Sequence, residues 1–95
     1  MNVKLTDIAE KTYFQITNKF SDSKAKIFSD KTMSVIEMIT LNNQIGSRYK
    51  KTPFRKFLIS NHFYLFYKIE KGIIYIVLFW DNKRNPVDLD IILSS

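Results

Sequence analysis

Apolar side chains in the first half of the chain recur with the period of a helix. From Asp7 to Phe20 they are spaced three or four residues apart, which places them on one helix face. This face consists of Ala9, Tyr13, Ile16 and Phe20. Asp7 and Glu10 have the spacing of a capping box, so the first helix is expected to begin at Asp7.

The same period returns after Ser21-Asp22-Ser23 and continues to Leu41. No Gly or Pro interrupts this stretch, which predicts a second helix from about Ser23 to Leu41. The two helices are expected to form an antiparallel hairpin. The segment Asn42 to Gly46 ends the helical half, and Gly46 is expected to supply a positive φ at the turn.

Alternation replaces the helical period in the second half. Three segments, 54–59, 63–69 and 73–80, are rich in aromatic and β-branched residues and are separated by turn-forming residues. They predict an antiparallel meander. Val3 and Leu5 alternate with polar neighbours, which predicts a short first strand before the helices.

The strand expected at 63–69 has two different faces. The face suited to a core carries Phe63, Leu65, Tyr67 and Ile69. The other face, expected to be partly solvated, carries His62, Tyr64, Phe66 and Lys68. The strand at 73–80 is apolar on both faces, which is typical of a central strand rather than an edge strand.

Together these patterns predict an α+β fold within a single domain spanning residues 1–95. An N-terminal strand and a two-helix hairpin would pack on one face of a mostly antiparallel, about four-stranded sheet. The opposite face of the sheet is expected to be open. The loop after residue 80 would display Lys83 and Arg84 at the rim of this face, and Pro86 would end the strand.

The net charge of +6 is concentrated in the second half. Residues 47–84 hold nine Lys or Arg against two acidic residues, a balance of +7, whereas residues 1–46 balance at +1 and the last eleven at −2. Such asymmetry indicates an anionic partner, either nucleic acid or an acidic protein segment. Plain solubility is the alternative explanation.

Composition excludes several kinds of chemistry. The chain has no cysteine, its two glycines cannot form a phosphate-binding loop, and no His, Asp or Glu cluster has metal-ligand spacing, so we expect no cofactor and no metal. The N-terminus has no apolar signal region, and the run 73–80 is less than half of a membrane span. We therefore expect a cytoplasmic protein with no membrane partner.

Several short stretches share their order and spacing with a known family. They are Asp7-Ile8-Ala9, Asn43-Gln44-Ile45-Gly46, Phe54-Arg55-Lys56-Phe57, 63–69 and 76–86. Through them the chain resembles, nearly end to end, the RelE/ParE superfamily of toxins from bacterial type II toxin-antitoxin systems. The resemblance implies a small toxin that a cognate antitoxin protein inactivates by wrapping its surface in a hetero-oligomer.

The resemblance leaves two kinds of target. RelE-like members cleave messenger RNA in the ribosome with Lys and Arg on the exposed sheet face and a tyrosine near the C-terminus, whereas ParE-like members act on DNA gyrase. Tyr64 stands where the RelE-like nucleases have an arginine, and the region of the tyrosine reads Pro86-Val87-Asp88-Leu89. We therefore expect a ParE-like toxin that binds a protein such as DNA gyrase. The alternatives are a RelE-like ribosome-dependent mRNA endonuclease and, third, an inactive relic or a simple nucleic-acid-binding module.

No residue is assigned a catalytic role. The densest run of cations extends from Arg48 to Lys56, and contact with phosphate or an acidic surface is weighed equally with a solvated loop. The candidates for binding the target or phosphate are Arg48, Lys50, Lys51, Arg55, Tyr64, Lys68, Lys83 and Arg84. Phe66 and Trp80 are candidates for antitoxin contact, and His62 is expected to be a solvated turn residue.

Overall fold

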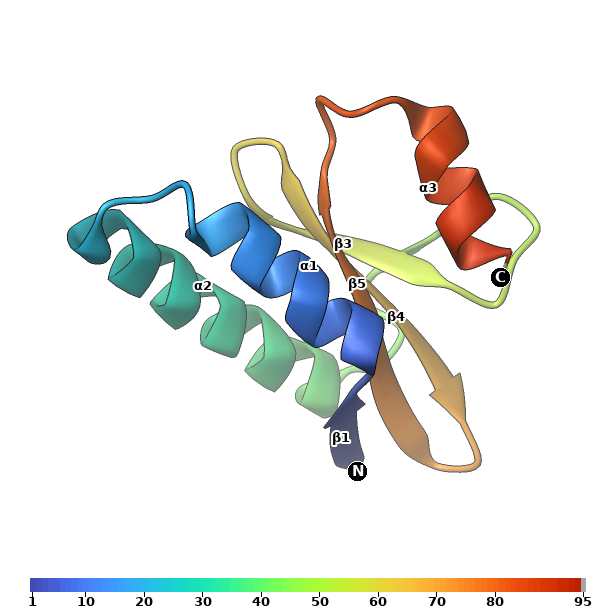
Figure 1. Cartoon of the computed structure of the whole chain (residues 1–95). Helices are drawn as coiled ribbons and strands as arrows, with labels where there is room; N and C mark the ends of the chain where they lie inside the picture. Colours follow the sequence, from blue (N-terminus) through green and yellow to red (C-terminus); the bar gives the residue numbers. More distant parts are fainter. Residues whose placement is uncertain (95) are drawn as a thin grey trace.

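Five strands form one sheet, and helices cover both of its faces (Figure 1). The computed structural model describes residues 1–94. The strands are β1 (Asn2–Leu5), β2 (Ser47–Arg48), β3 (Arg55–Ser60), β4 (Phe63–Glu70) and β5 (Ile73–Asp81). The helices are α1 (Asp7–Thr17), α2 (Asp22–Leu41) and α3 (Pro86–Leu93).

The strand order is β1-β5-β4-β3-β2, and within residues 1–94 only the β1–β5 pair is parallel. β5 therefore lies inside the sheet although it is the last strand of the chain, which confirms the prediction made from its two apolar faces. The predicted α+β class and antiparallel meander are also confirmed. The sheet has five strands rather than about four because β2, only two residues long, adds a short edge strand beside β3.

α1 begins at Asp7, as predicted, and α2 begins at Asp22, one residue before the predicted start. Thr6 caps α1, with its hydroxyl accepting the Ala9 N–H at 3.1 Å, so Asp7 is the first helical residue and not the cap. Ser21 caps α2 in the same way at Lys24. Both helices start where a hydroxyl satisfies an otherwise unpaired backbone N–H.

The inner face of the sheet packs against α1 and α2. Leu65 and Tyr67 are fully buried there, as predicted, and Phe63 is nearly so, whereas Ile69 at the end of β4 is partly exposed. Aromatic side chains meet edge-to-face, with the Phe63 ring 5.7 Å from that of Phe20. This cluster joins the helical hairpin to the sheet.

Gly46 is required by space and not by its backbone angle. The expectation of a positive φ was wrong, since among the described glycines only Gly72 has one. A Cβ at Gly46 would lie 2.8 Å from the Tyr67 ring and 2.9 Å from the Lys56 carbonyl oxygen. The close approach lets the Tyr67 hydroxyl accept the Gly46 N–H at 3.0 Å and donate to the Asn43 carbonyl at 2.9 Å.

The outer face of the sheet is covered, which contradicts the expectation of an open face. α3 folds back so that Leu89 packs against Phe66, Leu78 and Trp80 in a second core. Asn85 caps this helix by accepting the Val87 N–H at 3.0 Å, and Pro86 occupies its first turn. Pro86 therefore begins a helix as well as ending the strand region.

The Tyr67 hydroxyl provides a test of how the α2 end is held. Tyr67→Phe is expected to lower the free energy of unfolding by about 1–3 kcal/mol, because the buried Gly46 N–H loses its acceptor. Tyr75→Phe is the matched control, and its effect should stay within about 0.5 kcal/mol. Urea denaturation monitored by circular dichroism measures both. Equal stability of the two variants would contradict this role of Tyr67.

Candidate functional site

Aromatic and cationic side chains alternate across the outer face of the sheet. We call Tyr49, Lys56, Tyr64, Trp80 and Arg84 the outer row. The Lys56 Nζ lies 5.1 Å from the centre of the Tyr64 ring and 5.9 Å from that of Tyr49. Tyr64 and Trp80 are cross-strand partners, and the Arg84 guanidinium lies 4.6 Å from the Trp80 ring. Cation–π attraction therefore holds the two cations in defined places.

The strands position this row through simple alternation. Lys56 lies opposite Phe66 in the β3–β4 pair, and Tyr64 precedes Phe66 by two residues on the same face of β4. Arg84 follows β5 in a turn where its backbone N–H donates to the Asp81 carbonyl at 3.0 Å. The outer row thus combines the loop before β3, three neighbouring strands and the β5–α3 loop.

The helix α3 decides which members of the outer face can meet a partner. Phe66 and Trp80 are each 1% exposed, because Leu89 covers them. The expectation that the two side chains are exposed is therefore wrong, and their role in antitoxin contact stays a prediction. Tyr49, Lys56 and Tyr64 remain half-buried and accessible at the edge of α3.

A polar contact attaches α3 to the loop that precedes β3. The Tyr49 hydroxyl donates to Asp90 Oδ1 at 2.7 Å, and the Lys50 ammonium donates to Asp90 Oδ2 at the same distance. The hydrogen bonds from Lys50 and then Tyr49 lower the pKa of Asp90, and the bond to Asp90 raises the pKa of Lys50. Burial, followed by the bond to Asp90, raises the pKa of Tyr49.

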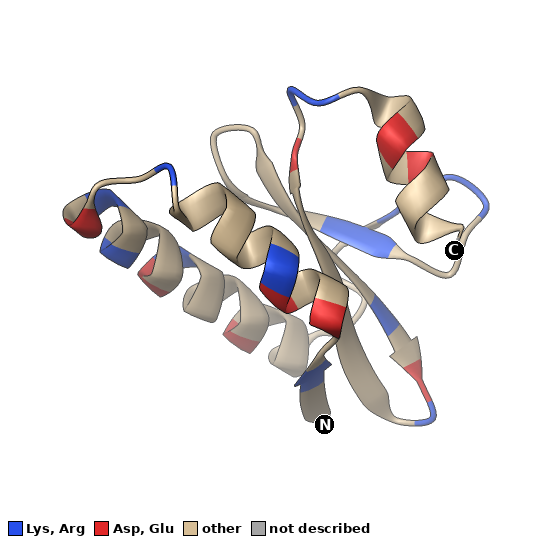
Figure 2. Ribbon diagram, in the orientation of Figure 1, with Lys and Arg blue, Asp and Glu red and all other residues tan. Residues whose placement is uncertain are grey.

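Three other cations predicted for the site lie outside the outer row, and one of them has an ion-pair partner. Lys68 pairs with Glu70 at 3.2 Å and lies above the Tyr75 ring. Lys51 and Lys83 are exposed in the loops on either side of α3. Figure 2 shows that Lys and Arg of the second half gather in β3, in the β2–β3 loop and in the β5–α3 loop.

Two predicted site residues lie away from the outer row. Arg55 alternates with Lys56, so its side chain points to the opposite face, where it donates to the Gly46 carbonyl at 2.7 Å. Arg48 pairs with Arg55 across β2 and β3 and donates to the Thr52 carbonyl. These two arginines hold loop backbone, and the structure does not bring them together with Tyr64 and Arg84.

Lys56 belongs to the outer row but was not among the predicted site residues. The sequence contains the signal that identifies it, because Phe57 and Ile59 face the inner core and so place Lys56 on the outer face. His62 lies in the turn before β4, as predicted, with its Nε2 3.5 Å from Asp81 Oδ1 and its ring against Phe63.

The described residues offer no site for a resident metal ion. No three His, Asp or Glu side chains come together among residues 1–94 in a way that could hold one. None of the helices in this part of the chain has the length and apolar character needed to cross a membrane.

Comparison with solved structures identifies proteins of similar fold. The chain resembles YoeB from Staphylococcus aureus, solved as a dimer, with a TM-score of 0.62 and 16% identity over 82% of this chain and 92% of that one. It also resembles E. coli YafQ, both as a point mutant and in the DinJ-YafQ complex. Each match has a TM-score of 0.59 and 10% identity over 86% of this chain and 93% of that one. No family model and no curated protein sequence matches the chain. The fold expected from the RelE/ParE resemblance is thus supported.

The contacts of Asp90 predict how pH affects α3. Because folding lowers the pKa of Asp90, its ionised carboxylate stabilises the attachment of α3 at any pH above 3.8, the ordinary pKa of an aspartate. This stabilisation is lost as the pH falls through the lower pKa of the folded state. Folding raises the pKa of Tyr49 and of Lys50, so the protonated groups stabilise the attachment below their ordinary pKa values of 10.0 and 10.5. This stabilisation is lost as the pH rises through the higher pKa values of the folded state. α3 should therefore be held equally well across the neutral range.

Hydrogen exchange tests this attachment. At neutral pH, Asp90→Asn should reduce the protection of α3 amides while leaving β4 and β5 protected, because it weakens only a local contact. Asp88→Asn is the matched control: it removes the same charge from the same helix, but the Asp88 side chain has no partner among residues 1–94. It should therefore change the protection of α3 less. Equal protection in the Asp90 variant and the wild type would contradict the attachment.

Proposed function

We propose that this protein is the toxin of a type II toxin-antitoxin system and that it acts on messenger RNA in the ribosome. YoeB and YafQ, which share its fold, are RelE-type toxins and ribosome-dependent mRNA endonucleases. These neighbours favour the RelE-like alternative over the ParE-like function expected from the sequence. We therefore prefer the RelE-like alternative, since both neighbours are RelE-type toxins.

The observation that carries the proposal is the position of Lys56 between two tyrosine rings. Asp90 neutralises Lys50, and Glu70 neutralises Lys68, whereas Lys56 and Arg84 have no carboxylate partner among residues 1–94. A free cation beside two accessible tyrosine rings, as at Lys56, suits single-stranded RNA, whose phosphates need cations and whose bases stack on rings. The unpaired charges of the outer row thus fit an RNA ligand.

The same cations suit the chemistry of metal-independent RNA cleavage. Attack of the 2′-hydroxyl on phosphorus places additional negative charge on the phosphate oxygens. Lys56 and Arg84 can stabilise that charge from fixed positions, since their rings restrict both side chains. In this proposal Tyr64 supports a base or the phosphate where other RelE-like nucleases use an arginine.

Binding to DNA gyrase is the second candidate function. It is favoured by Tyr64 at the position of that arginine and by residues 86–89, which begin α3 and contain no tyrosine. In this alternative the cations of the outer row would contact an acidic surface on the target protein.

We also propose an antitoxin protein as the partner of this chain. The DinJ-YafQ complex supports this partner, because one of the similar structures is of a toxin with its antitoxin. The expectation that the free chain exposes Phe66 and Trp80 for this partner no longer applies, since α3 buries both. The antitoxin is then expected to bind surfaces that remain accessible with α3 in place.

Induction of the chain in E. coli tests the proposed target. Incorporation of labelled methionine should fall within minutes, before incorporation of labelled thymidine. Lys56→Ala should weaken RNA binding about 10- to 100-fold and relieve the arrest, because it removes a charged contact of about 1.5–3 kcal/mol. Lys11→Ala, an exposed lysine on α1, is the matched control and should remain toxic.

Two outcomes of this experiment would contradict the proposal. Filamentation with DNA damage during continued translation would indicate the gyrase target. Normal growth at a verified level of folded protein would contradict a toxin of either kind.

A further inference from the structure

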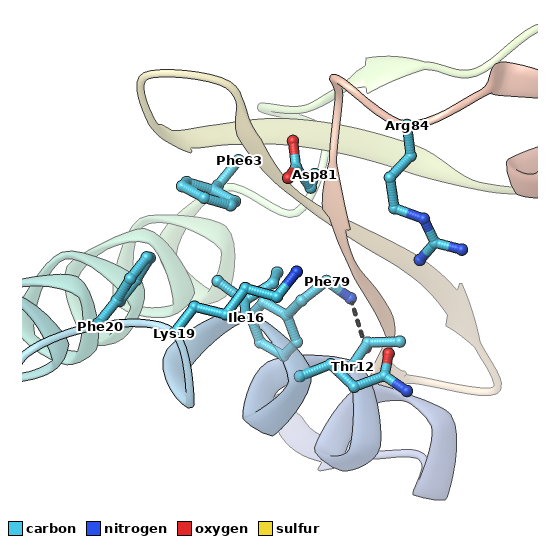
Figure 3. A pocket seen from close by; sticks show the side chains of 9 residues that line it. Thr12, Ile16, Lys19, Phe20, Phe63, Phe79, Asp81 and Arg84 are labelled. Atoms are coloured by element: carbon cyan, nitrogen blue, oxygen red, sulfur yellow. Dashed lines mark hydrogen bonds between the residues drawn. The ribbon is translucent and has the colours of Figure 1, made fainter.

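A pocket of about 380 Å³ opens between α1 and the end of β5. Its lining combines five polar or charged side chains with four apolar ones, which come from Ile16 and Phe20 on the helical side and from Phe63 and Phe79 on the sheet (Figure 3). Ile16, Phe63 and Phe79 are buried residues of the inner core, so the apolar part of the lining belongs to that core. The volume lies near the lower end of the range of pockets that bind small molecules.

The pocket exists because β5 extends beyond its parallel neighbour. β1 pairs with β5 only as far as Ile76, whereas β5 continues to Asp81. Side chains satisfy the edge that β1 leaves: the Thr12 hydroxyl accepts the Phe79 N–H at 3.0 Å, and the Thr6 hydroxyl donates to the Val77 carbonyl at 3.2 Å. These threonine hydroxyls already bond to the backbone groups that a further strand beside β5 would need. The site is therefore suited to an inserted side chain and not to strand pairing.

The charged side chains that line the pocket are two cations and one carboxylate, so its rim has a positive balance. Lys19 and Arg84 both line it, and the side chains of both lack an ion pair or a hydrogen bond among residues 1–94. Stacking on Trp80 holds the Arg84 guanidinium, which reaches toward the α1 side of the pocket in Figure 3. The Asp81 carboxylate, which also lines the pocket, accepts the Lys83 N–H at 2.9 Å and lies 3.5 Å from His62.

We propose that this pocket anchors a protein segment in which an apolar side chain is followed by a carboxylate. The apolar side chain would fill the space between Phe20 and Phe79, and the carboxylate would meet Arg84 and Lys19 at the rim. The charge of the rim, on a chain of net charge +6, selects an acidic partner. The identification of that partner as the antitoxin rests on the proposed function, whereas the chemistry of the site does not.

Peptide binding to the full chain, followed by ¹⁵N NMR, tests the site. The probe is acetyl-Gly-Phe-Glu-Gly-amide, and acetyl-Gly-Phe-Gln-Gly-amide is its uncharged match. The acidic peptide should shift amides of the α1 end and of the β5–α3 loop, and it should bind about five- to tenfold more tightly than the uncharged one because of its charged contact. A third probe, 3-phenylpropionate, supplies an apolar carboxylate without a peptide.

Variants separate the rim from the fold. Arg84→Gln and Lys19→Gln should each reduce the preference for the acidic peptide. Lys11→Gln is the control, because Lys11 lies on α1 but does not line the pocket, and it should leave the preference unchanged. Each spectrum also reports whether its variant is folded.

Three results would overturn the proposal. They are equal affinity for the two peptides, shifts that map to other elements, and tighter binding of 3-phenylpropionate than of the acidic peptide, which would indicate a small-molecule site. The test does not use toxicity. A chain that binds the acidic peptide but does not arrest growth would therefore refute the proposed function and leave the pocket assignment standing.

Discussion

The requirement that β5 be buried on both faces organises the molecule. Ile74 and Ile76 point into the inner core, Leu78 and Trp80 point into the outer core, and each is at most 1% exposed. Burying one such side chain stabilises the fold by about 1.5–3 kcal/mol, so neither face can be left to solvent without a large loss. α1 covers one face of this strand, and α3 must return to cover the other.

The return of α3 also determines where the chain can bind other molecules. It removes Phe66 and Trp80 from the surface and leaves Lys56, with its two tyrosine rings, at the helix edge. Arg84 occupies the turn that leads into α3 and contacts both the Trp80 ring and the pocket beside α1. The two proposed binding sites therefore meet at this arginine.

Much of the fold could be predicted from the sequence, because α1, α2 and the meander follow clear periods. α3 was missed because its eight residues are apolar on several sides, with Val87 and Ile91 exposed, and show no clean helical stripe. The parallel pairing of β1 depends on a contact that no local pattern encodes. For the site, the cations were found as a group, but dividing them between faces required the register that separates Arg55 from Lys56.

In the proposed function, the outer face of the sheet acts on messenger RNA in the ribosome. The most direct measurement incubates the purified chain with ribosomes that are translating one defined message and maps new RNA ends by primer extension. New ends should appear only when ribosomes are present, and the Lys56→Ala variant should produce fewer of them. DNA supercoiling by gyrase is assayed in parallel at the same concentration of the protein. Inhibited supercoiling together with an intact message would contradict the proposed function.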